Sequence, residues 1–345
     1  MPKLLTIAIP TYNRASILDR QLAWLAHDIK GFESECEIIV SDNCSTDDTQ
    51  DAIAQWQTFF ARTSTNFKVN TNKQNIGVIK NVAYCMNAAT SKYVWTIGDD
   101  DVIQKQTVAY IFNNIKIYQE LAVLILNFSA TDYLTGKLLS ERRYLIKDEE
   151  LPSNGKAIFE YCLQSDHVGL AFLTALVYRT ELIQQAIQKW TNSVNSLEAQ
   201  IFWTGFCAAG GSVKISKDVY VDYTCGTSYW LKNPKSAFQM NYSSPAVYLK
   251  LEEIGYSKIV CRRMLLKHWR NENNLRVILG ALRRWPLMTI KIMAPYLALV
   301  SVSALQVLLS RQDKNQIDWA NWELLQTTDS NEKLISQSSK VQVEP

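Results

Sequence analysis

Short apolar runs alternate with helical patterns along the first hundred residues. The apolar runs are rich in β-branched or aromatic residues and are bounded by polar turns, which predicts buried strands at 4–9, 36–40, 67–70 and 93–97. Apolar residues at helical spacing lie between the runs and predict helices at 14–28, 49–60 and 75–89, the second of them capped by residues 46–49. This rhythm predicts an α/β fold, with a mostly parallel sheet and helices on both faces.

Three of these strands end in polar clusters, at residues 10–14, 41–44 and 99–101. In sheets of this kind, ligands bind beyond the carboxyl ends of the strands. We therefore expect the three clusters to converge on one edge of the sheet and to form the binding site there.

The next part of the chain is less regular. Its pattern predicts a helix at 102–118, loops at 129–165 and two further helices at 180–190 and 197–209. Strands are expected at 121–128, 170–178 and 213–223. The sheet thus continues into the second hundred residues.

Composition excludes several classes of protein. The chain has 345 residues, a net charge of +3, 47% apolar and 20% charged residues, which is typical of a folded protein and excludes disordered and fibrous classes. The seven cysteines contain no C-x-x-C pair, so neither a disulfide scaffold nor a zinc ribbon is expected. The first apolar run is too short for a signal peptide, which favours a cytoplasmic location.

The C-terminal part of the chain is basic and then apolar. Residues 258–314 carry eleven Lys or Arg against two acidic residues, and 259–285 has the pattern of a basic amphipathic helix. Residues 286–309 carry one charge, Lys291, and exceed the roughly 20 apolar residues that cross a bilayer, but Pro286 and Pro295 interrupt them. We predict an interfacial or re-entrant helix on anionic lipid; the alternatives are full crossing and a helical hairpin packed on the rest of the protein.

Asp99, Asp100 and Asp101 form the sharpest chemical feature. Side chains alternate along a strand, so Asp99 and Asp101 can point the same way at the strand end. Two carboxylates suit Mg²⁺ or Mn²⁺, which takes substrate phosphate oxygens as further ligands. The alternative is an acidic cap on the helix expected directly afterwards.

Two other strand ends carry weaker signals. Asp42 and Asn43 follow the second strand, where an acid can bind a ribose hydroxyl or a base edge, although Asx residues also favour plain turns. Residues 10–14 could contact a nucleotide through their backbone and the Tyr12 ring, or could form a simple strand-to-helix turn.

Four segments together resemble the family 2 glycosyltransferases. They are IAIPTYNR at 7–14, IIVSDNCSTD at 38–47, NIGVIKN at 75–81 and WTIGDDD at 95–101. They follow the order and approximate spacing of that family, and the resemblance covers residues 3–105 strongly and 165–215 weakly. It implies a Rossmann-like GT-A fold that binds a nucleotide-diphosphate sugar.

The resemblance also implies roles for individual residues. Asp42 would bind the base or ribose, Pro10 and Thr11 would line the nucleotide pocket, and Asp99 and Asp101 would form a D-x-D element holding Mg²⁺ or Mn²⁺ against the diphosphate. The residues that it assigns to the nucleotide sugar are Pro10, Thr11, Tyr12, Arg14, Asp42, Asn43, Asn75, Gly77, Asn81, Asp99 and Asp100.

The catalytic base is less sharply indicated. The family places an acidic motif before a late helix, and Glu198 matches it, although Ala199 replaces the usual second Asp. Asp166 and His167 are other candidates. Glu198 could instead be a solvent-facing helix residue, and His167 a structural histidine. The aromatic residues in this half either stack on a sugar or belong to the core; they are Trp203, Tyr223, Tyr229 and Trp230.

The resemblance implies an inverting hexosyl- or deoxyhexosyltransferase, and the basic, apolar C-terminal region adds the expectation of a place at the inner face of the cytoplasmic membrane. Its acceptor would be a lipid-linked saccharide in surface-polysaccharide (O-antigen type) biosynthesis. A membrane-bound, inactive saccharide-binding or scaffold protein of the same fold is the alternative. A nucleotidyltransferase would need a glycine-rich loop, which 10–16 lacks, and aliphatic rather than stacking residues in the basic stretch argue against nucleic acid.

The predicted organisation begins with a GT-A catalytic domain at 1–225, with a nucleotide-sugar half at 1–105 and an acceptor half at 106–225. A linker at 226–257, a basic helical region at 258–325 and a polar tail at 326–345 follow.

Overall fold

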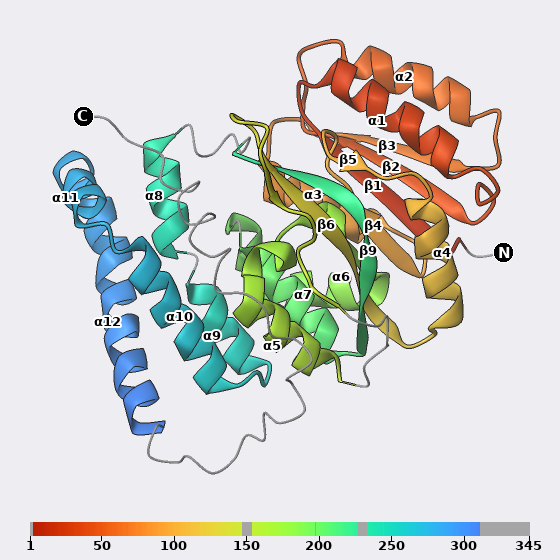
Figure 1. The fold of residues 1–345 in the computed structure, drawn as a ribbon. Coiled ribbons are helices and arrows are strands. Elements are labelled where there is room, and N and C mark those ends of the chain that lie inside the picture. Colours follow the sequence, from red (N-terminus) through yellow and green to blue (C-terminus); the bar gives the residue numbers. More distant parts are fainter. Residues whose placement is uncertain (1–2, 147–153, 197, 227–232, 244, 311–345) are drawn as a thin grey trace.

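The computed structural model describes residues 3–146, 154–196, 198–226, 233–243 and 245–310 (Figure 1). Nine strands form a single sheet in this part of the chain, in the order β3-β2-β1-β4-β8-β6-β9-β5, with β7 paired to β6. A group of C-terminal helices lies to one side of the sheet (Figure 1).

The first four strands form the parallel half of the sheet. They are β1 (Leu5–Thr11), β2 (Cys36–Asp42), β3 (Asn66–Thr71) and β4 (Tyr93–Thr96). The helices between them are α1 (Ala15–Asp28), α2 (Thr49–Phe60) and α3 (Val78–Ala88). Helices α1 and α2 lie side by side on one face and α3 on the other (Figure 1), so every residue of β2 is buried.

The second half of the sheet is mixed. Its strands are β5 (Val102–Ile103), β6 (Leu121–Asp132), β7 (Leu138–Ser140), β8 (Leu176–Arg179) and β9 (Ser212–Cys225). Strand β8 runs antiparallel to both β4 and β6, while β6 and β9 are parallel. The predicted α/β fold with flanking helices is confirmed, and antiparallel β8 joins its two parallel parts.

Helices and short 3₁₀ turns cover this second half. The α-helices are α4 (Thr107–Ile117), α5 (Gly155–Asp166), α6 (Thr180–Lys189) and α7 (Ala199–Ala209). The 3₁₀ turns are η1 (His167–Leu170), η2 (Leu173–Ala175) and η3 (Thr191–Asn195). Three predictions were wrong in extent. The helix expected from 102 begins at Thr107, because 102–103 pair with β9. In the strand expected at 170–178 only 176–178 are strand, since 170 and 173–175 are 3₁₀ turn. The loops expected at 129–165 contain the end of β6, β7 and most of α5.

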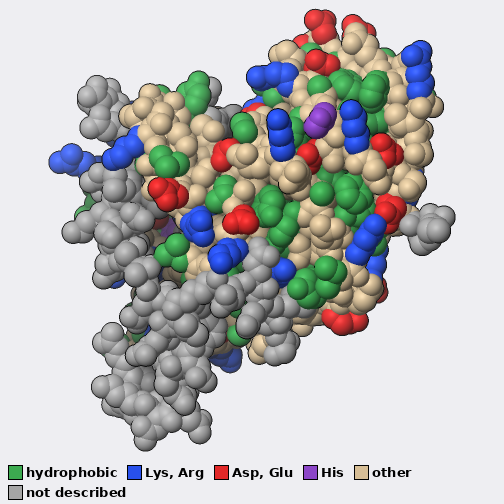
Figure 2. Space-filling view, turned by 45° about the vertical axis from the view of Figure 1, so that its right-hand side comes forward, with side chains coloured by type: hydrophobic (Ala, Val, Ile, Leu, Met, Phe, Trp, Pro, Cys, Tyr) green, Lys and Arg blue, Asp and Glu red, His purple; other side chains and the backbone are tan. Residues whose placement is uncertain are grey.

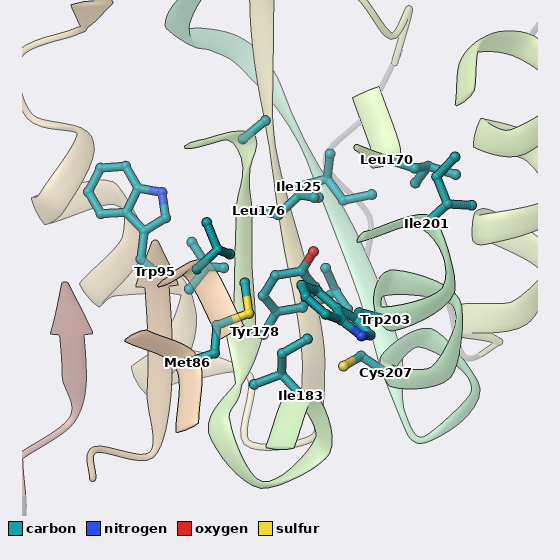
Figure 3. Close-up of a cluster of buried hydrophobic side chains, with 14 of the residues drawn as sticks. Met86, Trp95, Ile125, Leu170, Leu176, Tyr178, Ile183, Ile201, Trp203 and Cys207 are labelled. Atoms are coloured by element: carbon teal, nitrogen blue, oxygen red, sulfur yellow. The ribbon is translucent and has the colours of Figure 1, made fainter. Parts of the chain in front are cut away.

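Large side chains fill the space between β8 and α7 (Figure 3). Tyr178 of β8 and Trp203 of α7 are fully buried there, and the Tyr178 hydroxyl lies 2.8 Å from Thr204 Oγ1. Trp203 Nε1 donates to Ser193 Oγ at 3.0 Å, so its one polar group is satisfied inside the core. Core packing, one of the two expectations for Trp203, is confirmed.

Within the described residues, five helices follow the sheet. They are α8 (Pro234–Ser243), α9 (Ala246–Glu253), α10 (Lys258–Glu272), α11 (Leu275–Arg284) and α12 (Pro286–Ser310). The linker predicted at 226–257 is wrong where α8 and α9 form, because apolar residues such as Val247 and Leu251 are buried at helical spacing. The basic region predicted as one stretch is divided before Asn274, whose side chain accepts bonds from the first amides of α11.

Candidate active site

The ends of β1 and β4 are tied together by side chains. Thr11 Oγ1 donates to Asp99 Oδ2 at 2.7 Å, and Arg14 Nη1 donates to Asp99 Oδ1 at 2.7 Å. The same guanidinium nitrogen lies 2.7 Å from Asp100 Oδ2. Asp99 is buried, with 6% exposed, whereas Asp100 is 46% exposed, so Arg14 links an inner carboxylate to an outer one. The predicted convergence of these strand ends is thus present.

Asp101 has a partner of its own, Thr174 in η2, the 3₁₀ turn before β8. Its Oδ2 accepts a hydrogen bond from Thr174 Oγ1, which also accepts the Gly98 N–H at 2.8 Å. Thr174 is fully buried and its carbonyl accepts from Trp95 Nε1 at 2.8 Å. A Cβ at Gly98 would collide with the Asp101 carboxylate, so glycine at 98 is what allows this close approach.

Burial disfavours charge on two of these acids. Burial, together with the neighbouring Asp100 and Asp99 carboxylates, raises the pKa of Asp101 to about 6, although the Thr174 hydroxyl opposes the shift. Burial also raises the pKa of Asp99, against the opposing effect of Arg14 and Thr11. Arg14 is the cation that contacts Asp99 and Asp100, while Asp101 gains its hydrogen bonds from neutral donors.

The acidic triplet suits a divalent cation. The alternative of a helix cap is wrong, because α4 begins only at Thr107, with Gln106 at its N-cap. Within the described ranges, no cluster of three or more His, Cys, Asp or Glu side chains could hold a metal ion. One or two carboxylates are nevertheless the usual protein share for Mg²⁺ bound to substrate phosphates, and a cation would relieve the charge burial at Asp101. The residues therefore fit such an ion.

Asp42 has a structural role in its loop. The carboxylate is fully buried and accepts hydrogen bonds from the Ser45 backbone N–H at 3.1 Å, the Ser45 hydroxyl and the Gln50 amide. The turn interpretation is confirmed by these bonds. A ligand would reach Asp42 only after Ser45 or Gln50 moved away, and contact with base or ribose stays a prediction.

Asn43 ties the second strand end to the turn before α3. Its Nδ2 donates to Asn75 Oδ1 at 2.9 Å, its Oδ1 accepts the Ile76 N–H at 2.9 Å, and its own N–H donates to the Thr11 carbonyl at 2.9 Å. Asn75 Oδ1 also accepts the Gly77 N–H at 2.9 Å. A chain of hydrogen bonds therefore connects Asp99, through Thr11 and Asn43, to the start of α3.

Gly77 and Asn81 play different parts in this turn. Gly77 has a φ of +89° at the N-cap of α3, a conformation that favours glycine. Asn81 is buried and bonds the Ser41 hydroxyl at 2.6 Å and the Ser41 carbonyl at 2.8 Å, so it fastens α3 to β2. Asn81 thus has a structural role in holding α3 on the sheet, whereas Gly77 faces open space.

A cavity of about 220 Å³ lies at the start of α3. It is lined by Ile76, Gly77, Val78, Ile79, Lys80, Val194 and Ser196. The free N–H groups at a helix start favour anions such as phosphates. The cavity therefore lies between the turn at 76–80, which contains the predicted ligand residue Gly77, and Ser196, which precedes the predicted base Glu198.

The three base candidates differ in what the structure describes. Glu198 is partly buried at the N-cap of α7, two residues after Ser196. Burial raises the pKa of Tyr248, and the negative charge of Glu198 adds to this shift. Its role as a base stays a prediction. Asp166 ends α5 and His167 begins η1, and their side chains lie outside the described part of the structure.

Aromatic residues border the acidic triplet on the side of β9. Tyr223 packs on Phe172 with ring centres 4.8 Å apart, and burial, with Cys225 and Asp101 nearby, raises the pKa of Tyr223 to about 12. Pro10 is partly buried and Tyr12 is 42% exposed, so the Tyr12 ring is open to a ligand. Tyr229 and Trp230 lie outside the described residues.

Sequence reasoning missed the residues that position the carboxylates. Thr174 was hidden inside an expected strand, and Gln50 inside an ordinary helix. Gly98 did give a signal, because a glycine directly before three acids permits a close approach that no other residue allows.

An α/β sheet with acids at its strand ends and a glycine turn before a helix defines a nucleotide-binding class of fold. Residues 6–164 match the sequence profile of Glycosyl transferase family 2. Over these residues the chain is similar to the family 2 glycosyltransferases, and the resemblance seen in the sequence is confirmed.

Known relatives match short parts of the chain. Abequosyltransferase RfbV of Salmonella typhimurium is 34% identical over 110 residues, which are 31% of this chain and 31% of that protein. Validoxylamine A glucosyltransferase of Streptomyces hygroscopicus subsp. jinggangensis is 46% identical over 54 residues, 16% of this chain and 13% of that protein. The alignments thus span less than a third of the relatives' own length.

Solved structures share the fold over most of the chain. S. aureus TarS 1-349 has a TM-score of 0.61 at 16% identity, covering 97% of this chain and 91% of that chain. The same protein in complex with UDP-GlcNAc has a TM-score of 0.60 at 18% identity, covering 86% and 81%. The GT-A type of fold is therefore shared, including the C-terminal helical region.

Proposed function

We propose that the protein is a metal-dependent, inverting glycosyltransferase that moves a hexosyl or deoxyhexosyl group from a nucleotide-diphosphate sugar to a saccharide hydroxyl. The observation that carries the proposal is the junction of β1 and β4, where Thr11 and Arg14 hold Asp99 at the edge of a family 2 domain. This is the edge at which α/β sheets bind nucleotides.

The donor diphosphate would lie between the acidic triplet and the start of α3. The first N–H groups of α3 would favour the negative diphosphate, and Gly77 leaves the approach to the helix open. The cavity of about 220 Å³ beside Gly77 would hold part of the donor. The complex of TarS with UDP-GlcNAc supports a nucleotide sugar as the class of donor.

Asp101 and Asp99 would hold Mg²⁺ or Mn²⁺. When bound, such an ion offsets the negative charge that develops on the departing diphosphate. Thr174 and Gly98 keep the Asp101 carboxylate at the strand end, and Thr11 and Arg14 keep Asp99 there.

A base completes the transfer. In our proposal the Glu198 carboxylate accepts the proton of the acceptor hydroxyl; Asp166 and His167 are the other candidates. The acceptor oxygen forms its bond to the anomeric carbon as the bond from that carbon to the diphosphate oxygen breaks. The electron pair leaves with the diphosphate, and the configuration inverts.

The acceptor in this proposal is a lipid-linked saccharide of surface-polysaccharide assembly. The relative that is an abequosyltransferase supports this class of pathway, and the apolar α12 supports a site near the inner face of the cytoplasmic membrane. Such an acceptor would present its sugar at the level of the lipid headgroups.

The test is a screen of nucleotide sugars with Mn²⁺ for donor binding by thermal shift and for release of the nucleoside diphosphate. Asp99→Asn and Asp101→Asn should each abolish turnover while the protein stays folded. Asp51→Asn, an exposed acid on α2, is the matched control and should keep full activity. Full turnover by both site variants at limiting Mn²⁺ would refute the metal role. Donor binding without turnover by the unchanged protein would instead favour the inactive saccharide-binding alternative.

A further inference from the structure

The exposed apolar residues of the described chain are concentrated in two helices. Eleven of the 21 exposed large hydrophobic residues lie within 275–309, which are α11 and α12, although this segment is only 35 residues long. On the face shown in Figure 2, by contrast, acidic and basic side chains are interspersed among the apolar ones. We refer to these eleven exposed hydrophobic residues of α11 and α12 as the apolar face. Such a concentration of exposed hydrophobic residues marks an interaction surface.

Helix α11 presents a narrow apolar stripe bordered by arginines. Leu275, Leu279 and Leu282 follow one another at helical spacing and are 69%, 63% and 39% exposed. Arg276 and Arg283 are also exposed and lie seven residues apart, directly beside this stripe. Ala281, on the far side of the helix, is buried and marks the side that packs on the protein.

Helix α12 has one packed side and one open side. Thr289, Met293, Tyr296, Val300 and Ser303 are buried at helical spacing, on the side that packs on α10 and α8. The exposed large residues of the other side are Leu287, Ile290, Leu297, Val302, Leu305, Leu308 and Leu309. The helix lies at the edge of the molecule away from the sheet (Figure 1).

The packed side of α12 argues against a helix that crosses a bilayer. Residues 286–309 are long and apolar enough to cross one, with a mean hydropathy of 2.0. However, Tyr296 Oη lies 2.8 Å from His268 Nδ1, and Arg262, which is ion-paired with Glu252, donates to Ser303 Oγ at 3.3 Å. Crossing would withdraw α12 from these partners and leave polar groups in hydrocarbon.

Charge selects the partner of the apolar face. Residues 258–310 carry nine Lys or Arg and a single acid, Glu272. A second copy docked through this face would bring like charges together, whereas an anionic lipid surface complements them. A helix with an apolar stripe flanked by arginines is suited to lie in the plane of the headgroups.

We propose that α11 and the open side of α12 dock the protein on an anionic bilayer surface, with both helices lying along the membrane. The leucines of α11 enter the headgroup layer, and Arg276 and Arg283 contact lipid phosphates. This surface acts independently of the sugar-transfer proposal, because none of its residues belongs to the candidate active site.

Sedimentation of the full chain with vesicles tests the surface. Vesicles of equal parts phosphatidylglycerol and phosphatidylcholine should carry the protein down, and vesicles of phosphatidylcholine alone should carry much less. Leu279→Ser with Leu282→Ser should weaken partition about tenfold or more. Arg276→Gln with Arg283→Gln should weaken it about tenfold to thirtyfold. Salt at about 1 M should release the unchanged protein.

Matched controls use residues away from these helices. Leu134→Ser with Leu138→Ser removes two leucines that are 87% and 50% exposed, and Lys105→Gln with Lys137→Gln removes two exposed lysines. Both controls should sediment like the unchanged protein. Donor-induced thermal shifts should be equal in all variants, so failure of the docking proposal and failure of the transfer proposal give different results.

Four outcomes would overturn the docking proposal. The first is absence of binding to the anionic vesicles, and the second is unchanged binding by the leucine or arginine variants. The third is binding that resists alkaline carbonate, which would show a helix inserted across the bilayer. The fourth is a dimer in light scattering that the leucine variant dissociates, without vesicle binding, which would make the face an interface between copies.

Discussion

The Asp101 carboxylate should cost the metal-free protein stability at neutral pH. Its pKa in the folded protein is about 6, because burial and the Asp99 and Asp100 carboxylates disfavour its charge. An unfolded Asp has a pKa of about 3.9, so the difference of about two units corresponds to at most about 3 kcal/mol. A raised folded pKa means that the contribution is fully present below pH 4 and is lost as the pH rises through 6.

The perturbation is Asp101→Asn, which keeps the shape and an acceptor for the Thr174 hydroxyl but carries no charge. In the presence of a chelator at pH 7.5, we expect this variant to be more stable than the unchanged protein, by up to about 3 kcal/mol, or about 4 °C in Tm for a chain of this size. At about pH 3.5, below the unfolded pKa of about 3.9, the difference should nearly disappear. Thermal and urea unfolding measure both values.

Manganese should reverse the order of stability. At a hundredfold excess over its dissociation constant, an ion bound only to the folded state adds about 2.7 kcal/mol. We expect this gain for the unchanged protein and its loss in Asp101→Asn. Asp100→Asn is the control: Asp100 is 46% exposed and paired with Arg14, so its removal should change stability by less than about 1 kcal/mol. An Asp101→Asn variant no more stable than the unchanged protein without metal would refute the reasoning from burial, and an equal manganese gain would refute the ligand role.

Three further substitutions test the supports of the site. Thr174→Val removes the donor to Asp101 and the acceptor for Gly98 N–H. It should lower the free energy of unfolding in urea by about 1–3 kcal/mol and shift the pH dependence of Mn²⁺ affinity to higher pH. Thr174→Ser, which keeps the hydroxyl, should restore the stability and the pH dependence. Gly98→Ala should displace the Asp101 carboxylate and abolish Mn²⁺ binding measured by electron paramagnetic resonance; retained binding would contradict the packing argument. Gly77→Ala should cost about 1–2 kcal/mol because of its φ of +89°, whereas the control Gly280→Ala, in open space on α11, should be neutral or stabilising in thermal unfolding.

The sequence predicted the parallel half of the sheet well because its signals are local. Strand β2 is an apolar run with buried neighbours on both faces, and Asp42 and Asp99 stand where the strands end. Strand β8 was placed poorly, because residues 170–175 are as apolar as a strand but form the end of η1, a turn and η2, where η1 packs on α7 and η2 on β4. Hydropathy alone does not distinguish these two conformations.

In the candidate site, too, local features were predicted and long-range contacts were not. The positions of Asp99 and Asp101 after the fourth strand were predicted, but their different partners, Arg14 for Asp99 and Thr174 for Asp101, were not. Those partners lie 85 and 73 residues away in the chain, and a single sequence contains no signal for such pairs. Asn81 was assigned to the ligand from its motif, whereas its side chain bonds Ser41 of β2 and Asn72, which follows β3.

The pairing of β6 determines how long a fragment of the chain must be in order to fold by itself. This twelve-residue strand lies between β8 and β9, both of which are made later, and Leu121 pairs with Ser212. A nascent chain that has reached only residue 164, where the family match ends, would contain β6 without either neighbour and β4 without β8. Apolar strand edges of this kind pair readily with other chains and aggregate. Expression of the domain by itself therefore has to extend through Cys225, and folding during synthesis should remain incomplete until that residue has left the ribosome.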